Sequence, residues 1–122
     1  MLNLGDVKDE EVFKSLFVKP WHPTLIAVYG WILELELQGP CITEGYRDPR
    51  HKNDLHGIDS TLRAIDLRSW RYKEPEVLER IINKVWLYDP ERPEMKVAKL
   101  HDTGEGMHFH IQVHDRTVRR VK

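Results

Sequence analysis

The chain has 122 residues, of which 40% are hydrophobic and 32% are charged, and its formal net charge is -1. This composition is typical of a globular protein, and the length suits one core, so we expect a single domain over residues 1–122. The near-neutral charge excludes a broad basic surface for nucleic acid. No stretch approaches the roughly 18 to 20 uncharged residues that cross a bilayer, so we expect no membrane partner.

The cysteine content and the N-terminus indicate where the chain is made. Its single cysteine, Cys41, has no partner for a disulfide within the chain. The N-terminal stretch MLNLGDVKDEEVFKSLF lacks the basic start and the apolar run of a signal peptide. The sequence therefore predicts synthesis in a reducing cytoplasm.

The first part of the chain favours helices. The stretch DEEVFKSLFV (9–18) predicts a short amphipathic helix with Asp9 as its cap. After a break at Pro20 and Pro23, the stretch TLIAVYGWILELELQG (24–39) spaces apolar residues along one helical face. Its LELEL segment also alternates as a strand would, but we expect a helix.

The remainder favours strands around one more helix. A loop is expected over 44–61, strands over 41–43, 62–70, 94–102 and 106–115, and a helix over 74–89. That helix is the clearest element, because Pro75 suits its first turn and apolar residues form a stripe along one face. This order predicts an α+β fold with a small, mostly antiparallel sheet and helices packed on it.

Four of the seven histidines lie between residues 101 and 114. In MHFHIQVH (107–114), a period of two places the apolar residues on one side and His108, His110, Gln112 and His114 on the other. Histidines two apart in a strand lie about 7 Å from each other, so both can approach one metal ion, or one can bind while the other acts on bound water. The alternative is a solvated strand face that carries imidazoles.

A second group of candidate ligands lies in DLHGIDSTLRAIDLR (54–68). Catalytic zinc usually takes three protein ligands from His, Asp and Glu, and this segment supplies His56 and Asp66. An aspartate in an otherwise apolar strand is costly unless a cation or hydrogen bonds compensate its charge. The alternative is an ion pair between Asp66 and Arg63 or Arg68.

Three ordered pieces of the chain resemble the zinc D-Ala-D-Ala metallopeptidases, a family that includes L-alanyl-D-glutamate endopeptidases, murein endopeptidases and phage endolysins. ITEGYR resembles a strand-turn segment of the form Ser/Thr-x-Gly-Tyr/Phe-Arg, and the stretch from His56 through RAIDLR resembles S-x-H-x-x-G-x-A-x-D. MHFHIQV resembles the closing H-x-H strand. The pieces span Ile42 to Val113, in the family order.

The resemblance implies a hedgehog-like fold and a zinc site made by His56, Asp66 and His110. His108 would then lie beside the metal-bound water as the base, with Glu105 as the other candidate base. Arg47 would bind a carboxylate or carbonyl of the substrate, since a guanidinium matches a carboxylate with two parallel hydrogen bonds.

The chain departs from the family pattern at the first ligand. Nine residues separate His56 from Asp66, where the family usually has six, and Asp59 has the usual spacing. We expect His56 to be the ligand, because imidazole suits zinc and a glycine follows it. Asp54 stands where the family commonly has serine.

The register of the last motif also leaves alternatives. The chain fits both a pattern in which Glu105 is the base and His108 the ligand and one in which His110 is the ligand; we expect the second. If both histidines bound the metal together with His56 and Asp66, the site would be closed and structural.

These features predict a zinc peptidase that hydrolyses an amide bond in peptidoglycan peptides. A phage or prophage lysis enzyme, made without a signal peptide and acting on the cell wall after release, fits best; an intracellular dipeptidase fits the same facts. The alternatives are a non-catalytic phage structural or binding module with a structural or remnant metal site and, less favoured, a metal-dependent nuclease.

Overall fold

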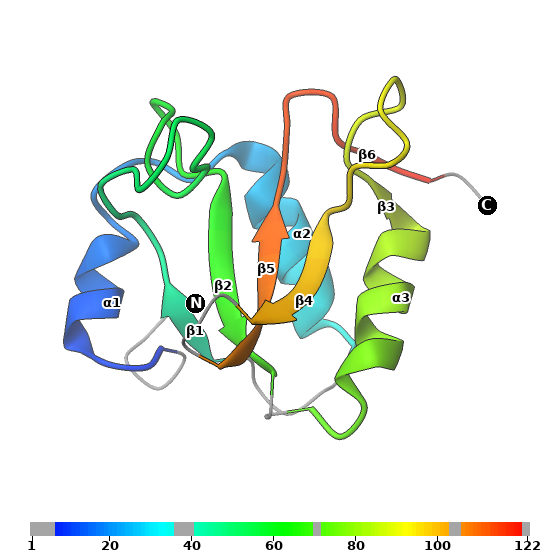
Figure 1. Cartoon of the computed structure of the whole chain (residues 1–122), viewed down its shortest axis with the longest axis horizontal. Helices are drawn as coiled ribbons and strands as arrows, with labels where there is room; N and C mark the ends of the chain where they lie inside the picture. The colour runs from blue at the N-terminus through cyan, green and yellow to red at the C-terminus, as the bar shows by residue number, and fades with distance from the viewer. Residues whose placement is uncertain (1–6, 36–40, 70–71, 103–105, 121–122) are drawn as a thin grey trace.

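The structure, a computed structural model, describes residues 7–35, 41–69, 72–102 and 106–120. Their α+β architecture is an antiparallel four-stranded sheet with strand order β1-β2-β5-β4, helices around it, and a two-stranded β3-β6 pair (Figure 1). The elements are α1 (Glu10–Ser15), α2 (Pro23–Leu33), β1 (Ile42–Glu44), β2 (Ala64–Arg68), α3 (Pro75–Val85), β3 (Trp86–Leu87), β4 (Ala98–Asp102), β5 (Met107–Gln112) and β6 (Val118–Arg119). None of the helices in the described ranges is both long and apolar enough to cross a membrane.

The two N-terminal helices begin where expected and are shorter. Asp9 caps α1, because its carboxylate accepts a hydrogen bond from the N–H of Val12 at 2.9 Å. His22 caps α2 by accepting from the N–H of Thr24 at 3.1 Å, and its other ring nitrogen lies 2.8 Å from a carboxylate oxygen of Asp115. His22 therefore has a structural role at the start of α2. The end of the predicted helix, 36–39, lies outside the described residues.

The prediction of a helix continuing to Asp89 is wrong. The helix α3 ends at Val85, and Trp86 adopts an extended backbone conformation. Trp86 and Leu87 then form β3, which pairs with Arg119 and Val118 of β6. Pairing with a segment more than thirty residues away overrides the local helical pattern, which a reading of neighbouring residues does not detect.

The four-stranded sheet has one apolar face, which forms the core. In the β2–β5 ladder Ile65 lies opposite Ile111, and Leu67 lies opposite Phe109; all four side chains are fully buried. They belong to one cluster with the buried side of α2 (Leu25, Val28, Tyr29, Ile32). Figure 1 shows α2 behind the sheet, with α1 beside β1 and α3 beside β4.

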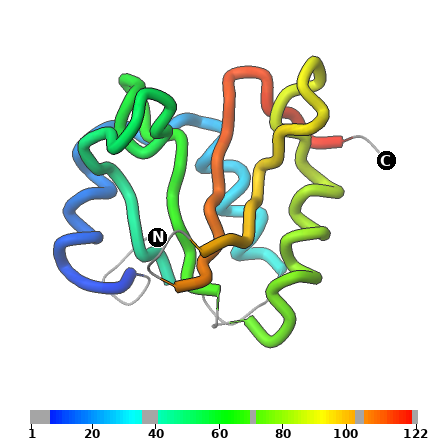
Figure 2. Tube along the Cα trace, viewed as in Figure 1, coloured from blue at the N-terminus to red at the C-terminus, as the bar shows by residue number. Residues whose placement is uncertain are grey.

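The other residues of the same strands form the opposite, polar face. Asp66 lies opposite His110, and Arg68 lies opposite His108. On the far side of β5, Lys99 is paired with His110, and His101 with His108. Alternation along antiparallel strands thus collects the charged and imidazole side chains on one surface. The long connection from β1 to β2, visible as the green loops of the tube in Figure 2, lies at one end of this sheet.

Candidate metal centre

His56, Asp66 and His110 come from three separate segments and meet on the polar face. His56 lies in the β1–β2 connection, Asp66 on β2 and His110 on β5. One ligand atom from each lies within 4.8 Å of the others, so the group can hold a metal ion. His110 Nδ1 is 3.0 Å and His56 Nε2 is 3.2 Å from the same oxygen, Asp66 Oδ1. His56 is 1% exposed and Asp66 is 7% exposed, so water screens their charges little.

The tautomer of His56 follows from its second contact. Its Nδ1 lies 2.8 Å from the carbonyl oxygen of Gly45. A carbonyl only accepts hydrogen bonds, so Nδ1 carries the hydrogen and donates it. In a neutral ring the lone pair is then on Nε2, the atom that faces Asp66.

The tautomer of His110 follows from a longer chain of contacts. The side-chain amide nitrogen of Gln112 donates to the carbonyl of Lys96 at 2.7 Å, which turns the oxygen of Gln112 toward His110. That oxygen lies 3.0 Å from His110 Nε2, so Nε2 carries the hydrogen. The lone pair of neutral His110 is therefore on Nδ1, which also faces Asp66.

Two imidazole lone pairs and a carboxylate oxygen thus converge. Burial alone would raise the pKa of Asp66, but when the rings of His110 and His56 are protonated, their hydrogen bonds and positive charge lower its pKa well below the usual value. Asp66 is therefore an anion at neutral pH. When both rings are neutral, no proton lies between the two ring nitrogens and the carboxylate oxygen. A bound cation would relieve the repulsion between their lone pairs. Each histidine also donates its other N–H to an oxygen, as metal-binding histidines generally do.

His108 lies beside this group. Its Nε2 is 3.6 Å from the other carboxylate oxygen of Asp66, and its side chain is 16% exposed. His101, the cross-strand neighbour of His108, has its ring centroid 4.8 Å from that of His108. Burial, followed by the charges of His108 and His110, lowers the pKa of His101. Imidazoles therefore extend the site along β5 and onto β4, which departs from a fully solvated strand face.

Arg47 borders the site, and its guanidinium is already engaged. Its Nε and Nη2 donate to the two oxygens of Asp54 at 3.0 and 3.2 Å, and its Nη1 lies 3.4 Å from Glu44. Asp54 also accepts from the backbone N–H groups of Arg50 and His56. Asp54 thus holds Arg47 and the His56 loop together. Substrate binding by Arg47 stays a prediction.

The remaining candidates are placed as follows. Glu105 lies outside the described residues, and its role as a base stays a prediction. Asp59 forms an ion pair with Arg63 and is not part of the metal-binding group found among the described residues. The other donors of Arg63 go to Val113 and Tyr88. These contacts of Arg63 do not include the ion pair with Asp66 that was the alternative to a metal site.

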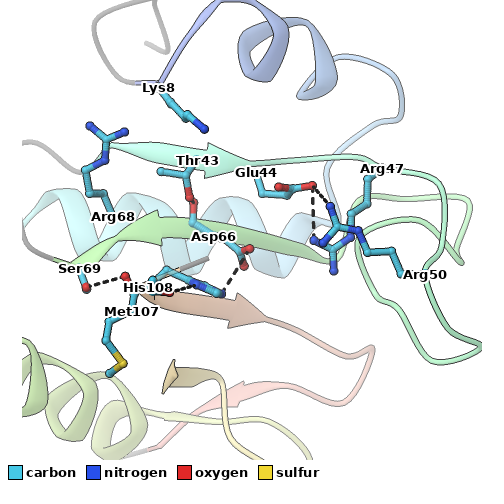
Figure 3. Close-up of a pocket in the computed structure, with 11 residues that line it drawn as sticks. Lys8, Thr43, Glu44, Arg47, Arg50, Asp66, Arg68, Ser69, Met107 and His108 are labelled. Atoms are coloured by element: carbon cyan, nitrogen blue, oxygen red, sulfur yellow. Dashed lines mark hydrogen bonds and ion pairs between the residues drawn. The ribbon is translucent and has the colours of Figure 1, made fainter. Parts of the chain in front are cut away.

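Two pockets flank the three residues of the metal centre. The first has a volume of about 410 Å³ and lies toward β1, with Lys8, Thr43, Arg68, Ser69 and Met107 in its wall (Figure 3). The second, of about 370 Å³, lies toward β4, with His51, Leu55, Lys99 and His101 in its wall. Both pockets are also lined by Arg47, Arg50, Asp66 and His108. A ligand at the metal centre therefore has space on both sides.

Sequence reasoning missed the residues that orient the ligands. Gln112 lies two residues after His110 and so on the same face of the strand. This spacing was the signal in the sequence that could have identified it as a neighbour of His110. Gly45 acts through its backbone carbonyl, which leaves no signal in residue type. A comparison of the chain with protein-family models, curated proteins and solved structures finds no match. The fold and the site define an α+β protein with a candidate centre of two histidines and one aspartate on an accessible sheet face.

Proposed function

We propose that this protein is a zinc-dependent peptidase with a hedgehog-like fold that hydrolyses an amide bond in peptidoglycan peptides. The observation that carries the proposal is the convergence of His56 Nε2, His110 Nδ1 and Asp66 Oδ1, with both ring tautomers set by second contacts. Nitrogen and oxygen donors in this number suit a catalytic zinc site. The family motifs in the sequence supply the substrate class, with a phage or prophage lysis enzyme that acts on the cell wall as the best fit.

His56, Asp66 and His110 would hold the zinc ion. When bound, zinc supplies a Lewis acid that polarises a carbonyl and lowers the pKa of water. His108, at the edge of this group and open to the first pocket, takes the proton from the attacking water and returns it to the leaving amine. Arg47, which lines both pockets, orients the substrate.

The position of His108 supports an open site over a closed structural one. Its Nε2 lies 3.6 Å from Asp66 Oδ2, while the two proposed histidine ligands, His56 and His110, contact Asp66 Oδ1. His108 also lines both pockets, whereas His56 lines neither. A site with three ligands leaves a coordination position for water and substrate.

A second candidate function is a non-catalytic binding or structural module on the same fold. The observation that favours it is the engagement of Arg47 by Asp54, because a guanidinium already paired in this way has fewer donors for a substrate. This candidate predicts a metal site without hydrolysis.

The test combines metal content with hydrolysis. We expect near-stoichiometric zinc by elemental analysis in the wild type, its loss in His56→Ala, Asp66→Ala and His110→Ala, and its retention in His108→Ala. Purified peptidoglycan should gain free amino groups with the wild type, and His108→Ala should reduce that rate by about 10²- to 10⁴-fold, the usual contribution of a general base. His114→Ala is the matched control, since His114 lines neither pocket.

The alternative outcomes assign the other functions. Zinc loss in all four variants would indicate a closed structural site. Zinc retention without any hydrolysis by the wild type would favour the non-catalytic module. A wild type that takes up no zinc would contradict the proposal outright.

A further inference from the structure

The pocket toward β1 is basic although the chain as a whole has a net charge of -1. Its wall contains four basic side chains (Lys8, Arg47, Arg50, Arg68) and two acidic ones (Glu44, Asp66). Asp66 belongs to the metal centre, where a bound divalent ion would more than balance its charge. The pocket therefore attracts an anionic group.

The basic residues lie at two ends of the pocket, as Figure 3 shows. At one end, Arg47 and Arg50 lie 3.4 and 3.9 Å from the carboxylate of Glu44. At the other end lie Lys8 and Arg68, together with Thr43 and Ser69. The second end is thus the one at which the lining carries basic side chains and hydroxyl groups.

Lys8 and Arg68 are anchored by their backbones on either side of the start of β1. The N–H of Lys8 donates to the carbonyl of Ile42 at 2.8 Å, and the N–H of Arg68 donates to the carbonyl of Cys41 at 2.9 Å. The sheet therefore determines the positions of the Cα atoms of both residues. Arg68 also lies directly opposite His108 in the β2–β5 ladder, and such partners have Cβ atoms about 5 Å apart.

Ser69 adds a hydrogen-bond acceptor at the same end. Its hydroxyl donates to the carbonyl of Met107 at 3.0 Å, and the residue is 5% exposed. Because its hydrogen is already used, the oxygen of Ser69 can accept but not donate. It therefore suits an amide N–H of a peptide beside the anionic group.

We propose that Lys8 and Arg68 form a carboxylate-binding subsite next to the metal centre. The pocket toward β1 then selects peptides with a carboxylate on the β1 side of the bond that is cut. The inference rests on the proposed function, because it takes the pocket toward β1 as part of the substrate-binding site. It deepens that function by naming the charge of one side of the substrate and the residues that recognise it.

The test measures binding without hydrolysis. The full chain is stripped of metal with a chelator and dialysed, so that a carboxylate cannot bind through zinc. It is then titrated with N-acetylglutamate methylamide and with the isosteric N-acetylglutamine methylamide, which differ in charge, while amide chemical shifts are followed by NMR. A third probe, N-acetylalanine, places the carboxylate at a chain end.

We expect a carboxylate probe to bind more tightly than the glutamine probe and to shift the amide signals of Lys8, Thr43 and Ser69. Lys8→Gln and Arg68→Gln should each weaken the carboxylate probe by about three- to tenfold and leave the glutamine probe unchanged. Lys84→Gln and Arg80→Gln on α3 are matched controls, since both are exposed and line neither pocket. If Arg68→Gln does not fold, the exposed Lys8 still provides the test.

Equal binding of the acidic and neutral probes, or an acidic preference that survives in both variants, would overturn the subsite. A preference for the glutamate probe over N-acetylalanine would assign the carboxylate to a side chain, and the reverse would assign it to a chain end; both support the subsite. Failure of the two proposals is distinguishable. Carboxylate binding without hydrolysis would contradict the peptidase proposal and support the subsite. Hydrolysis without a charge preference would support the peptidase proposal and contradict the subsite.

Discussion

Gln112 determines which ring nitrogen of His110 faces Asp66. Its amide oxygen lies 3.0 Å from His110 Nε2, and its amide nitrogen is tied to the carbonyl of Lys96 at 2.7 Å. Gln112 is 3% exposed, so no solvent competes for these bonds. The ring of His110 is thereby held with Nδ1 toward Asp66, 3.0 Å away.

This relationship predicts the effect of Gln112 on metal affinity. Gln112→Ala should weaken zinc binding by about 10- to 100-fold, because His110 loses the acceptor that sets its tautomer. The measurement is competition against a chromophoric chelator. Gln112→Glu is the control, since it keeps an acceptor oxygen for His110 and should lose less affinity than the alanine variant. Unchanged affinity in Gln112→Ala would show that the ring needs no such support.

Gly57 is a second residue on which the site depends. A Cβ atom there would lie 2.0 Å from the carbonyl oxygen of Arg47 and 3.1 Å from the ring of Pro49, so the backbone next to His56 would have to move. Gly57→Ala should therefore lower the free energy of unfolding by about 1 to 3 kcal/mol and weaken zinc binding. Urea denaturation and chelator competition measure the two effects.

Gly30 provides the matched control for that substitution. It lies inside α2, and no heavy atom outside its own helix and neighbours comes within 4 Å of a Cβ built there. Gly30→Ala should stabilise the fold by about 0.5 to 1 kcal/mol, because alanine loses less backbone entropy in a helix. Equal destabilisation by both substitutions would contradict the argument from close approach at Gly57.

Asp54 holds the β1–β2 connection together, and its replacement should be costly. Its two oxygens accept from Arg47 and from the backbone N–H groups of Arg50 and His56. Asp54→Asn places an amide NH₂ against one of these donors and removes the charge, so we expect a loss of about 2 to 4 kcal/mol in urea denaturation. Asp48→Asn on the same connection is exposed and should change stability by less than about 0.5 kcal/mol.

Asp89 should contribute to the pH dependence of stability. A hydrogen bond from the backbone N–H of Glu91 and the contact with Arg92 lower the pKa of Asp89 below its ordinary value, although burial opposes them. A lowered pKa in the fold stabilises it above the unfolded value of about 3.9, and this stability is lost as the pH falls through the folded value. Asp89→Asn should therefore be less stable than wild type at pH 7 and approach it near pH 2, as measured by urea denaturation. A difference that is constant with pH would contradict this origin.

The agreement between prediction and structure differs between features that depend on neighbouring residues and features that depend on distant segments. The cap at Asp9 and the apolar side of the segment 107–113 follow from short-range rules. The structure confirms the cap and buries Phe109, Ile111 and Val113 fully, whereas Met107 at the start of β5 is exposed and does not join the core as expected. The end of α3 does not follow from such rules. The helix ends at Val85 because Trp86 pairs with Arg119, and that pairing depends on how the C-terminal segment returns to the end of α3.

The same division applies to the metal centre. The sequence by itself determined the donor types and the strand parity that puts His108, His110 and Gln112 on one face, because side chains alternate along any strand. Only the tertiary structure decided that His56, and not Asp59, joins Asp66 and His110, since the β1–β2 connection closes through contacts of Asp54, Arg47 and Gly57. It also decided that Lys8 and Arg68, sixty residues apart, line one pocket, because β1 lies between their backbones.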